Sequence, residues 1–210
     1  MLFRSPLLDN VRGKSAAPIA RAGMILVTSA QAGEGKTFTA INLALSLATE
    51  LDTQVLLVEA DPGRPAAMQR LGVAEGSGLL DLLAAPGQGL AACQLDTNVP
   101  KLSLMRVGRR TDRDAELLSS QAMHDLLDQL AREQPDCVVV FDAPPLLVTP
   151  EARSLALLMG QVVLVVEAGQ TPQADIVQAA EMLEKCPVVM SVLNKAHVSA
   201  AGANQFTYYA

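Results

Sequence analysis

The stretch from residue 24 to 48, MILVTSAQAGEGKTFTAINLALSLA, restricts the possible folds more than any other part of the chain. The apolar run Met24–Val27 predicts a buried strand, and the leucines and alanines of 41–48 predict a buried helix. Between them, residues 30–37 match the pattern [AG]xxxxGK[ST]. A strand, a glycine-rich loop and a helix in this order predict a phosphate-binding loop.

The loop contains the groups that bind phosphate. Consecutive backbone N–H groups at 33–37 would point at an anion, the helix N-terminus adds partial positive charge, and Lys36 adds a full charge. Thr37 would place its hydroxyl on Mg²⁺. The expected nucleotide contacts in this loop are Ala32, Gly33, Glu34, Gly35, Lys36, Thr37 and Phe38. The strict motif has glycine where this chain has Ala30, so a glycine-rich turn that merely caps a helix is the alternative interpretation.

Carboxylates follow two further apolar runs. Glu59 and Asp61 come at the end of 54–61, and Asp142 ends the run 137–142. The carboxyl ends of parallel strands form the ligand-binding edge of an open α/β sheet. Asp142, after four apolar residues, fits the Walker B acid that holds Mg²⁺. The alternative for Glu59 and Asp61 is a strand end capped by a polar turn.

The remaining pattern predicts the fold class. Strand-like and helix-like segments alternate through the chain, which favours a mainly parallel sheet. We expect strands at 102–107, 161–167 and 187–193, and helices at 78–83, 114–132, 150–159 and 172–184. Half of the 210 residues are hydrophobic but only 3% are aromatic, which suits aliphatic strands covered by helices. The prediction is an α/β, three-layer α/β/α P-loop NTPase fold.

The domain organisation predicted from the sequence has three parts. Residues 1–22 are weakly periodic and basic, and we expect a mobile or partner-docking arm. Residues 23–195 form the P-loop domain. Residues 196–210 lack periodicity and carry the only two tyrosines of the chain, Tyr208 and Tyr209, so we expect a flexible tail.

The charge and the apolar pattern of the sequence limit the classes of partner that the chain could bind. A net charge of −6 without clustered Lys and Arg argues against a nucleic-acid partner. No apolar stretch reaches the ~18 residues needed to span a bilayer. The three cysteines show no CxxC spacing and predict reduced, buried thiols. We therefore expect a cytoplasmic protein whose membrane contact, if any, is peripheral and made through a partner.

These residues resemble a known family, the bacterial tyrosine autokinases (BY-kinases) of exopolysaccharide loci, especially the exosortase-associated subfamily. These kinases are P-loop ATPases related to the ParA/MinD group. The resemblance spans about residues 21–195, with the three nucleotide motifs of the family at Ala30–Thr37, Val58–Arg64 and Val138–Asp142. It rests on TSAQAGEGKTFTAINLALSLA, VLLVEADPGRP, GLLDLL, ELLSSQAM, VVVFDAPPLLVTPEARSLALLMGQVVLVVEAGQTP and VLNKA.

The resemblance implies an activity and roles for residues. The implied activity is transfer of the γ-phosphoryl of ATP, with Mg²⁺, to Tyr208 and Tyr209 of a neighbouring subunit. Lys36 would contact the β/γ-phosphates and Asn194 would lie near adenine. The implied magnesium residues are Thr37, Asp61 and Asp142, and the implied proton acceptor is Asp61 or Glu59. The implied partners are a membrane-embedded polysaccharide chain-length (co-polymerase) activator and further copies of this chain.

Several positions depart from the family pattern and leave two alternatives open. The hhhDxDxR motif has Glu59 for its first Asp and Gly63 for its Arg, which keeps a degenerate nucleotide-binding regulator as a possible reading. An ATPase switch of the ParA/MinD type is the other alternative. Those proteins carry a second lysine where this chain has Gln31, which argues against that reading. The ring-forming E-x-x-R-x-x-R element is not found in residues 1–23.

Overall fold

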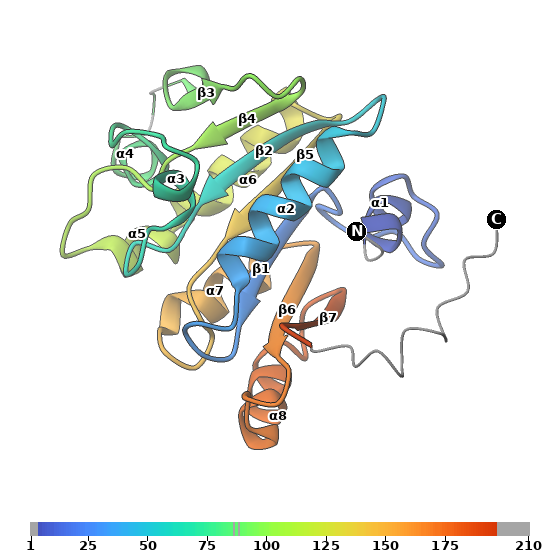
Figure 1. Cartoon of the computed structure of the whole chain (residues 1–210). Helices are drawn as coiled ribbons and strands as arrows, with labels where there is room; N and C mark the ends of the chain where they lie inside the picture. Colours follow the sequence, from blue (N-terminus) through green and yellow to red (C-terminus); the bar gives the residue numbers. More distant parts are fainter. Residues whose placement is uncertain (1–3, 86, 88, 197–210) are drawn as a thin grey trace.

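The computed structural model describes residues 4–85, 87 and 89–196 and shows a seven-stranded sheet in the order β3-β4-β2-β5-β1-β6-β7 (Figure 1). All neighbouring strands pair in parallel except β3 with β4, which pair antiparallel. The mainly parallel α/β sheet predicted from the sequence is thus confirmed. The strands are β1 Met24–Ser29, β2 Gln54–Glu59, β3 Gln94–Asp96, β4 Leu102–Met105, β5 Cys137–Asp142, β6 Gln161–Glu167 and β7 Val189–Asn194.

Helices cover both faces of the sheet (Figure 1). They are α1 Arg4–Val11, α2 Lys36–Ala48, α3 Ala67–Arg70, α4 Leu79–Ala84, a 3₁₀ turn at Leu90–Ala92, α5 Asp114–Leu118, α6 Gln121–Glu133, α7 Pro150–Leu158 and α8 Gln173–Met182. Because side chains alternate along a strand, Val55 and Leu57 join the core under α1 and α2, whereas Leu56 and Val58 join the opposite core. The result is three layers, with apolar side chains filling both interfaces.

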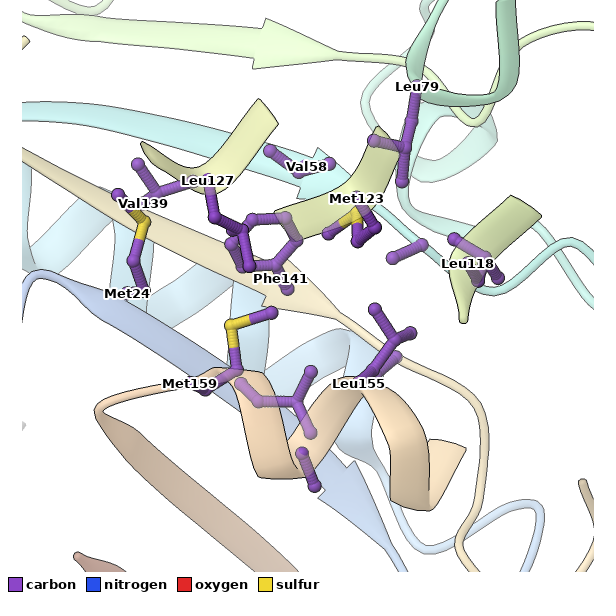
Figure 2. Close-up of a cluster of buried hydrophobic side chains, with 14 of the residues drawn as sticks. Met24, Val58, Leu79, Leu118, Met123, Leu127, Val139, Phe141, Leu155 and Met159 are labelled. Atoms are coloured by element: carbon purple, nitrogen blue, oxygen red, sulfur yellow. The ribbon is translucent and has the colours of Figure 1, made fainter. Parts of the chain in front are cut away.

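The core under α4, α6 and α7 is built around Phe141 (Figure 2). Phe141 is fully buried on β5, and Met123 and Leu127 of α6 and Leu155 of α7 lie around its ring. Because the core has few aromatic residues, aliphatic and thioether side chains fill the space around this ring. The strand that ends in Asp142 is therefore firmly anchored one residue before its carboxylate.

The structure differs from the sequence prediction at 114–132, where one helix was expected. Two helices are present, α5 and α6, and the break falls at Ser119–Ser120. The Ser119 hydroxyl donates to the Ala115 carbonyl at 2.9 Å, and the Ser120 hydroxyl donates to the Leu117 carbonyl at 2.7 Å. Serine side chains that bond the backbone in this way offer it an alternative to helix continuation. The short strand β3 and helix α3 were also not predicted, since three or four residues carry little periodicity.

The N-terminal segment also differs from the expected mobile arm. Helix α1 buries Leu7 and Leu8 against the core under α2. The fully buried amide of Gln161 donates to the Leu7 carbonyl at 3.2 Å and to the Ala22 carbonyl at 2.7 Å. The Arg4 guanidinium donates to the Ser46 carbonyl near the end of α2 at 2.9 Å. Helix α1 is therefore packed onto the nucleotide-loop helix and the sheet, whereas most of residues 12–20 are exposed.

Candidate functional site

The glycine loop between β1 and α2 has the backbone conformation of an anion cradle. Gly33 has φ of 94° and Gly35 has φ of 101°, a region that disfavours residues with a side chain. The N–H groups of residues 33–37 donate to no acceptor within the described residues. Unpaired N–H groups at a helix N-terminus bind anions through their dipoles. The predicted phosphate loop is therefore present as a formed turn.

Residues from distant loops fix this turn in place. Glu34 is buried, and its carboxylate accepts hydrogen bonds from the Gln31 N–H at 2.8 Å and from the Thr171 hydroxyl. Its carbonyl accepts the Asn194 amide at 2.9 Å, and Lys195 donates to the Gly33 carbonyl at 2.9 Å. The Glu34 side chain thus braces the loop from inside, while its backbone N–H is one of those expected at the nucleotide. Sequence reasoning missed Thr171 and Lys195 because their contacts join residues more than 130 positions apart.

Replacement of Gly35 by alanine is expected to destabilise this loop more than the same change at Gly33. A Cβ at Gly35 would lie 2.0 Å from the Asn194 amide nitrogen, whereas a Cβ at Gly33 meets nothing within 4 Å. Both changes carry the cost of a positive φ, about 1–3 kcal/mol. Thermal unfolding and titration with ATP should show the larger loss for Gly35→Ala. Adding Asn194→Ala to Gly35→Ala should recover part of it, and equal losses at the two glycines would contradict the contact.

Lys36, the first residue of α2, forms a buried ion pair with Asp61. Lys36 Nζ lies 3.0 Å from Asp61 Oδ2, and the two side chains are 8% and 4% exposed. The other Asp61 oxygen accepts the Arg64 N–H at 3.0 Å, which fixes the turn after β2. The structure therefore brings together the P-loop lysine and one of the acids that the resemblance implies as a magnesium residue or proton acceptor. The lysine that supplies the full charge of the loop is thus the buried partner of an acid.

Asp142 lies at the end of β5, directly opposite Glu59 in the β2–β5 register, and is fully buried. Neither of its carboxylate oxygens has a hydrogen-bond partner within the described residues. Burial raises the pKa of Asp142 from 3.8 to about 7, against the lowering effects of the Lys36 charge and the Thr37 hydroxyl. A buried carboxylate that lacks a partner beside a threonine hydroxyl matches the oxygen ligands that Mg²⁺ takes. These residues fit a divalent cation.

Glu59, which the resemblance implies as one of two candidate proton acceptors, makes a structural contact. It is 3% exposed, and its Oε1 accepts the backbone N–H of Met68 at 3.2 Å. The carboxylate thus ties the end of β2 to helix α3. Within residues 4–85, 87 and 89–196, no three His, Cys, Asp or Glu side chains converge on a common metal position.

The remaining site predictions divide between exposed positions and positions outside the described residues. Phe38 is 54% exposed on the first turn of α2, and Ala32 is exposed in the loop. Tyr208 and Tyr209 lie outside the described residues. In the described part of the chain, every helix is too short or too polar to cross a membrane.

Comparison with known proteins also identifies a nucleotide-binding domain. Residues 25–205 match the family described as the CobQ/CobB/MinD/ParA nucleotide binding domain. The tyrosine-protein kinase YwqD of Bacillus subtilis is 32% identical over 162 residues, which cover 77% of this chain and 67% of YwqD. The solved kinase domain of VpsO has a TM-score of 0.74 at 26% identity and covers 93% of this chain and 97% of that domain.

A longer relative matches over a part of its length. The succinoglycan biosynthesis transport protein ExoP of Rhizobium meliloti is 31% identical over 187 residues, and this chain spans 23% of it. The family match extends over most of the chain, and the sheet order, glycine loop and strand-end acids lie within it. The chain therefore belongs to the CobQ/CobB/MinD/ParA family of nucleotide-binding domains and, within that family, to the bacterial tyrosine-protein kinases.

Proposed function

We propose that this chain binds ATP with Mg²⁺ on the glycine loop and transfers the γ-phosphoryl group to Tyr208 and Tyr209. The observation that supports this most is the buried group of Lys36, Asp61 and Asp142, beside a loop whose N–H groups find no acceptor in the described part of the chain. Phosphoryl transfer depends mainly on positioning and charge neutralisation, which such a site supplies. Membership of the tyrosine-kinase family supports tyrosine as the acceptor.

The roles follow from the positions of the side chains. On phosphate binding, Lys36 would exchange part of its contact with Asp61 for the β/γ-phosphates. Asp142 and Thr37 would hold Mg²⁺ together with water and phosphate oxygens, and Asp61 lies near enough to Lys36 to act with them. Mg²⁺, when bound, neutralises charge on the phosphates. Asn194 anchors the loop through Glu34, which leaves its side-chain oxygen to accept from the adenine amino group.

The proposal also covers the biological system and the cellular location of the kinase. ExoP is named a biosynthesis transport protein for succinoglycan, which supports a polysaccharide system as the context. We propose that a membrane-embedded polysaccharide co-polymerase activates this chain at the inner face of the cytoplasmic membrane. The chain would also associate with further copies of itself, with no nucleic-acid partner.

The direct test is incubation of purified chain with ATP and Mg²⁺, followed by phosphotyrosine detection and mass spectrometry of the C-terminal peptide. Mixing two variants then separates transfer between subunits from transfer within one. The first is Lys36→Met with an intact tail, and the second is Tyr208→Phe/Tyr209→Phe with an intact loop. We expect phosphotyrosine on the first protein, because the second supplies the active site. Its absence, with wild type active, would exclude transfer between subunits.

One contact bears on the alternative of a ParA/MinD-type switch. Gln31 stands where those proteins carry their second lysine. Its amide donates to Asp175 Oδ2 on the first turn of α8 at 3.1 Å, so this side chain braces its own subunit. A neutral side chain held within the subunit supplies no charge to a partner's nucleotide. This contact favours the kinase over a dimeric switch.

A further inference from the structure

Strand β7 forms one edge of the sheet, and its apolar side chains are poorly covered (Figure 1). Within the described residues, β6 is its only strand neighbour. Every second residue of β7 is exposed, and two of these are apolar, Val189 at 41% and Leu193 at 63%. In β6, by contrast, all residues but the last are buried. The described part of the chain therefore leaves β7 without the cover that its apolar side chains would need.

The backbone of β7 also has unused hydrogen-bonding groups. The Val162 N–H of β6 donates to the Val188 carbonyl at 2.8 Å, and the register places Val162 beside Val189. The even-numbered residues of β7 therefore bond to β6. Because bonding alternates along a strand, the N–H and C=O groups of Val189, Ser191 and Leu193 point away from β6. These outward groups find no partner among the described residues.

The two edges of the sheet differ in how they are protected. The opposite edge is β3, which has three residues and ends in the charged Asp96. Short strands and charged side chains are common protections of an exposed edge. Strand β7 has six residues, contains neither a charge nor a proline, and pairs with β6 without a bulge. An edge of this composition is suited to the addition of another strand.

The chain beyond β7 contains a segment that fits this edge. Residues 204–209, NQFTYY, are uncharged and end in four residues of high strand propensity. Lys195, directly after β7, has a left-handed φ of 57°, which is typical of a turn and not of a continuing strand. A connection of the length of 195–203 spans about 15–18 Å, whereas neighbouring strands lie about 4.8 Å apart. The segment can therefore return to lie beside β7.

We infer that residues 204–209 of the same chain add to the free edge of β7 as an antiparallel strand. The outward N–H and C=O groups of β7 then pair with the backbone of this segment. Successive side chains of a strand point to opposite faces, so Tyr208 and Tyr209 lie on different faces of the sheet in any register. Each of the two rings therefore meets one row of β7 side chains.

Both faces of β7 offer apolar contacts to a ring. One row contains the exposed Val189 and Leu193, and the other contains the half-buried Met190 and Val192. Aromatic and β-branched side chains form favourable pairs across strands, and thioether sulfur makes favourable contacts with rings. Side chains as well as backbone groups thus hold the added strand.

This docking regulates phosphorylation, a consequence that rests on the proposed kinase function. A tyrosine held on β7 is withheld from the active site of its own chain and of any neighbour, so the docked tail is a self-inhibited state. A phosphotyrosine carries a charge of about −1.5 to −2 at neutral pH. Strand β7 has no charged side chain to pair with it. Phosphorylation therefore favours release of the tail.

A proline on the free edge tests the docking. The Ser191 N–H points outward, so Ser191→Pro removes a donor toward the tail and leaves the pairing with β6 intact. Ser191→Thr keeps this N–H and is the matched control. The chain has no tryptophan, and Tyr208 and Tyr209 are its only tyrosines, so tyrosine fluorescence comes from the tail alone.

Fluorescence quenching by acrylamide is measured on the full chain without nucleotide, with the free peptide NQFTYYA as the reference for undocked tyrosine. We expect quenching of the parent chain to be at least threefold weaker than that of the peptide. Ser191→Pro should raise quenching to the peptide value, whereas Ser191→Thr should leave it at the parent value.

A second pair of variants keeps the test valid if proline unfolds the chain. Val189→Lys places a charge on the edge, and lysine on an edge strand opposes pairing. Leu51→Lys is its control, because Leu51 is an exposed apolar residue in the turn after α2. Amide exchange followed by NMR should show the Leu193 N–H exchanging at least tenfold faster in Val189→Lys than in the parent and in Leu51→Lys.

The outcomes separate docking within one chain from pairing between copies. Protection of the tyrosines that is independent of chain concentration, and is lost in both blocking variants, would support the inference. Protection that appears only as the concentration rises would assign the edge of β7 to a second copy and overturn it. Quenching of the parent chain equal to that of the free peptide would also overturn it.

Phosphotyrosine formation separates the docking from the proposed function. With ATP and Mg²⁺, both blocking variants should form phosphotyrosine at least threefold faster than the parent and control chains. Equal rates in the blocked and parent chains would overturn the regulatory consequence. Docked tyrosines in a chain that forms no phosphotyrosine would support the docking and overturn the kinase proposal.

Discussion

Lys36→Met is expected to abolish phosphotyrosine formation and, in addition, to lower the stability of the nucleotide-free chain. The catalytic loss follows from removal of a charged contact to phosphate, about 1.5–3 kcal/mol of binding. The stability loss follows from the 3.0 Å ion pair with Asp61, since removing one partner of a buried pair costs about 3–5 kcal/mol. Kinase assays and denaturant unfolding would measure the two effects separately.

A double variant is the control for this prediction. Lys36→Met/Asp61→Asn removes the uncompensated charge, so it should regain much of the lost stability while remaining inactive. Recovery of stability without activity would show that loss of the charged side chains of the site, and not unfolding, stops catalysis. A Lys36→Met chain as stable as wild type would contradict the buried ion pair, and unchanged ATP affinity and turnover would remove the phosphate-loop assignment.

Asp142→Asn is expected to impair Mg²⁺-dependent transfer while stabilising the nucleotide-free protein at alkaline pH. The folded protein holds the Asp142 proton up to a pKa of about 7, whereas the unfolded chain releases it near 3.8. Between these values the folded state binds more protons, so wild-type stability falls as pH rises through this window. The full difference is on the order of 4 kcal/mol, and Asp142→Asn should remove this dependence.

The measurements are urea unfolding from pH 4 to 8 and phosphotyrosine formation at limiting Mg²⁺. We expect at least a hundredfold loss of turnover, because the metal supplies several kcal/mol of charge stabilisation. Asp136→Asn is the matched control, since Asp136 is exposed just before the same strand. Wild-type turnover in Asp142→Asn at limiting Mg²⁺ would make Asp142 a structural cap. A pH profile parallel to that of wild type would contradict the raised pKa.

The sequence by itself determined the sheet type, the glycine loop and the strand-end acids. Runs such as 137–142 have the length and β-branched content of buried parallel strands, and the spacing of Lys36 and Thr37 after the glycines is a local motif. Local patterns of this kind predict structure well, because hydrophobic periodicity and turn-forming residues act over only a few positions. The family resemblance then supplied a role for Asp61 that spacing alone could not give.

The tertiary structure decided how these residues are used. Three features depend on contacts between segments that are separate in the chain. They are the pairing of Lys36 with Asp61, the support of α3 by Glu59 and the packing of α1 on α2. No periodicity encodes such contacts, because they follow from strand order and loop paths. The free edge of β7 has the same origin, since it follows from the place of β7 at the end of the strand order.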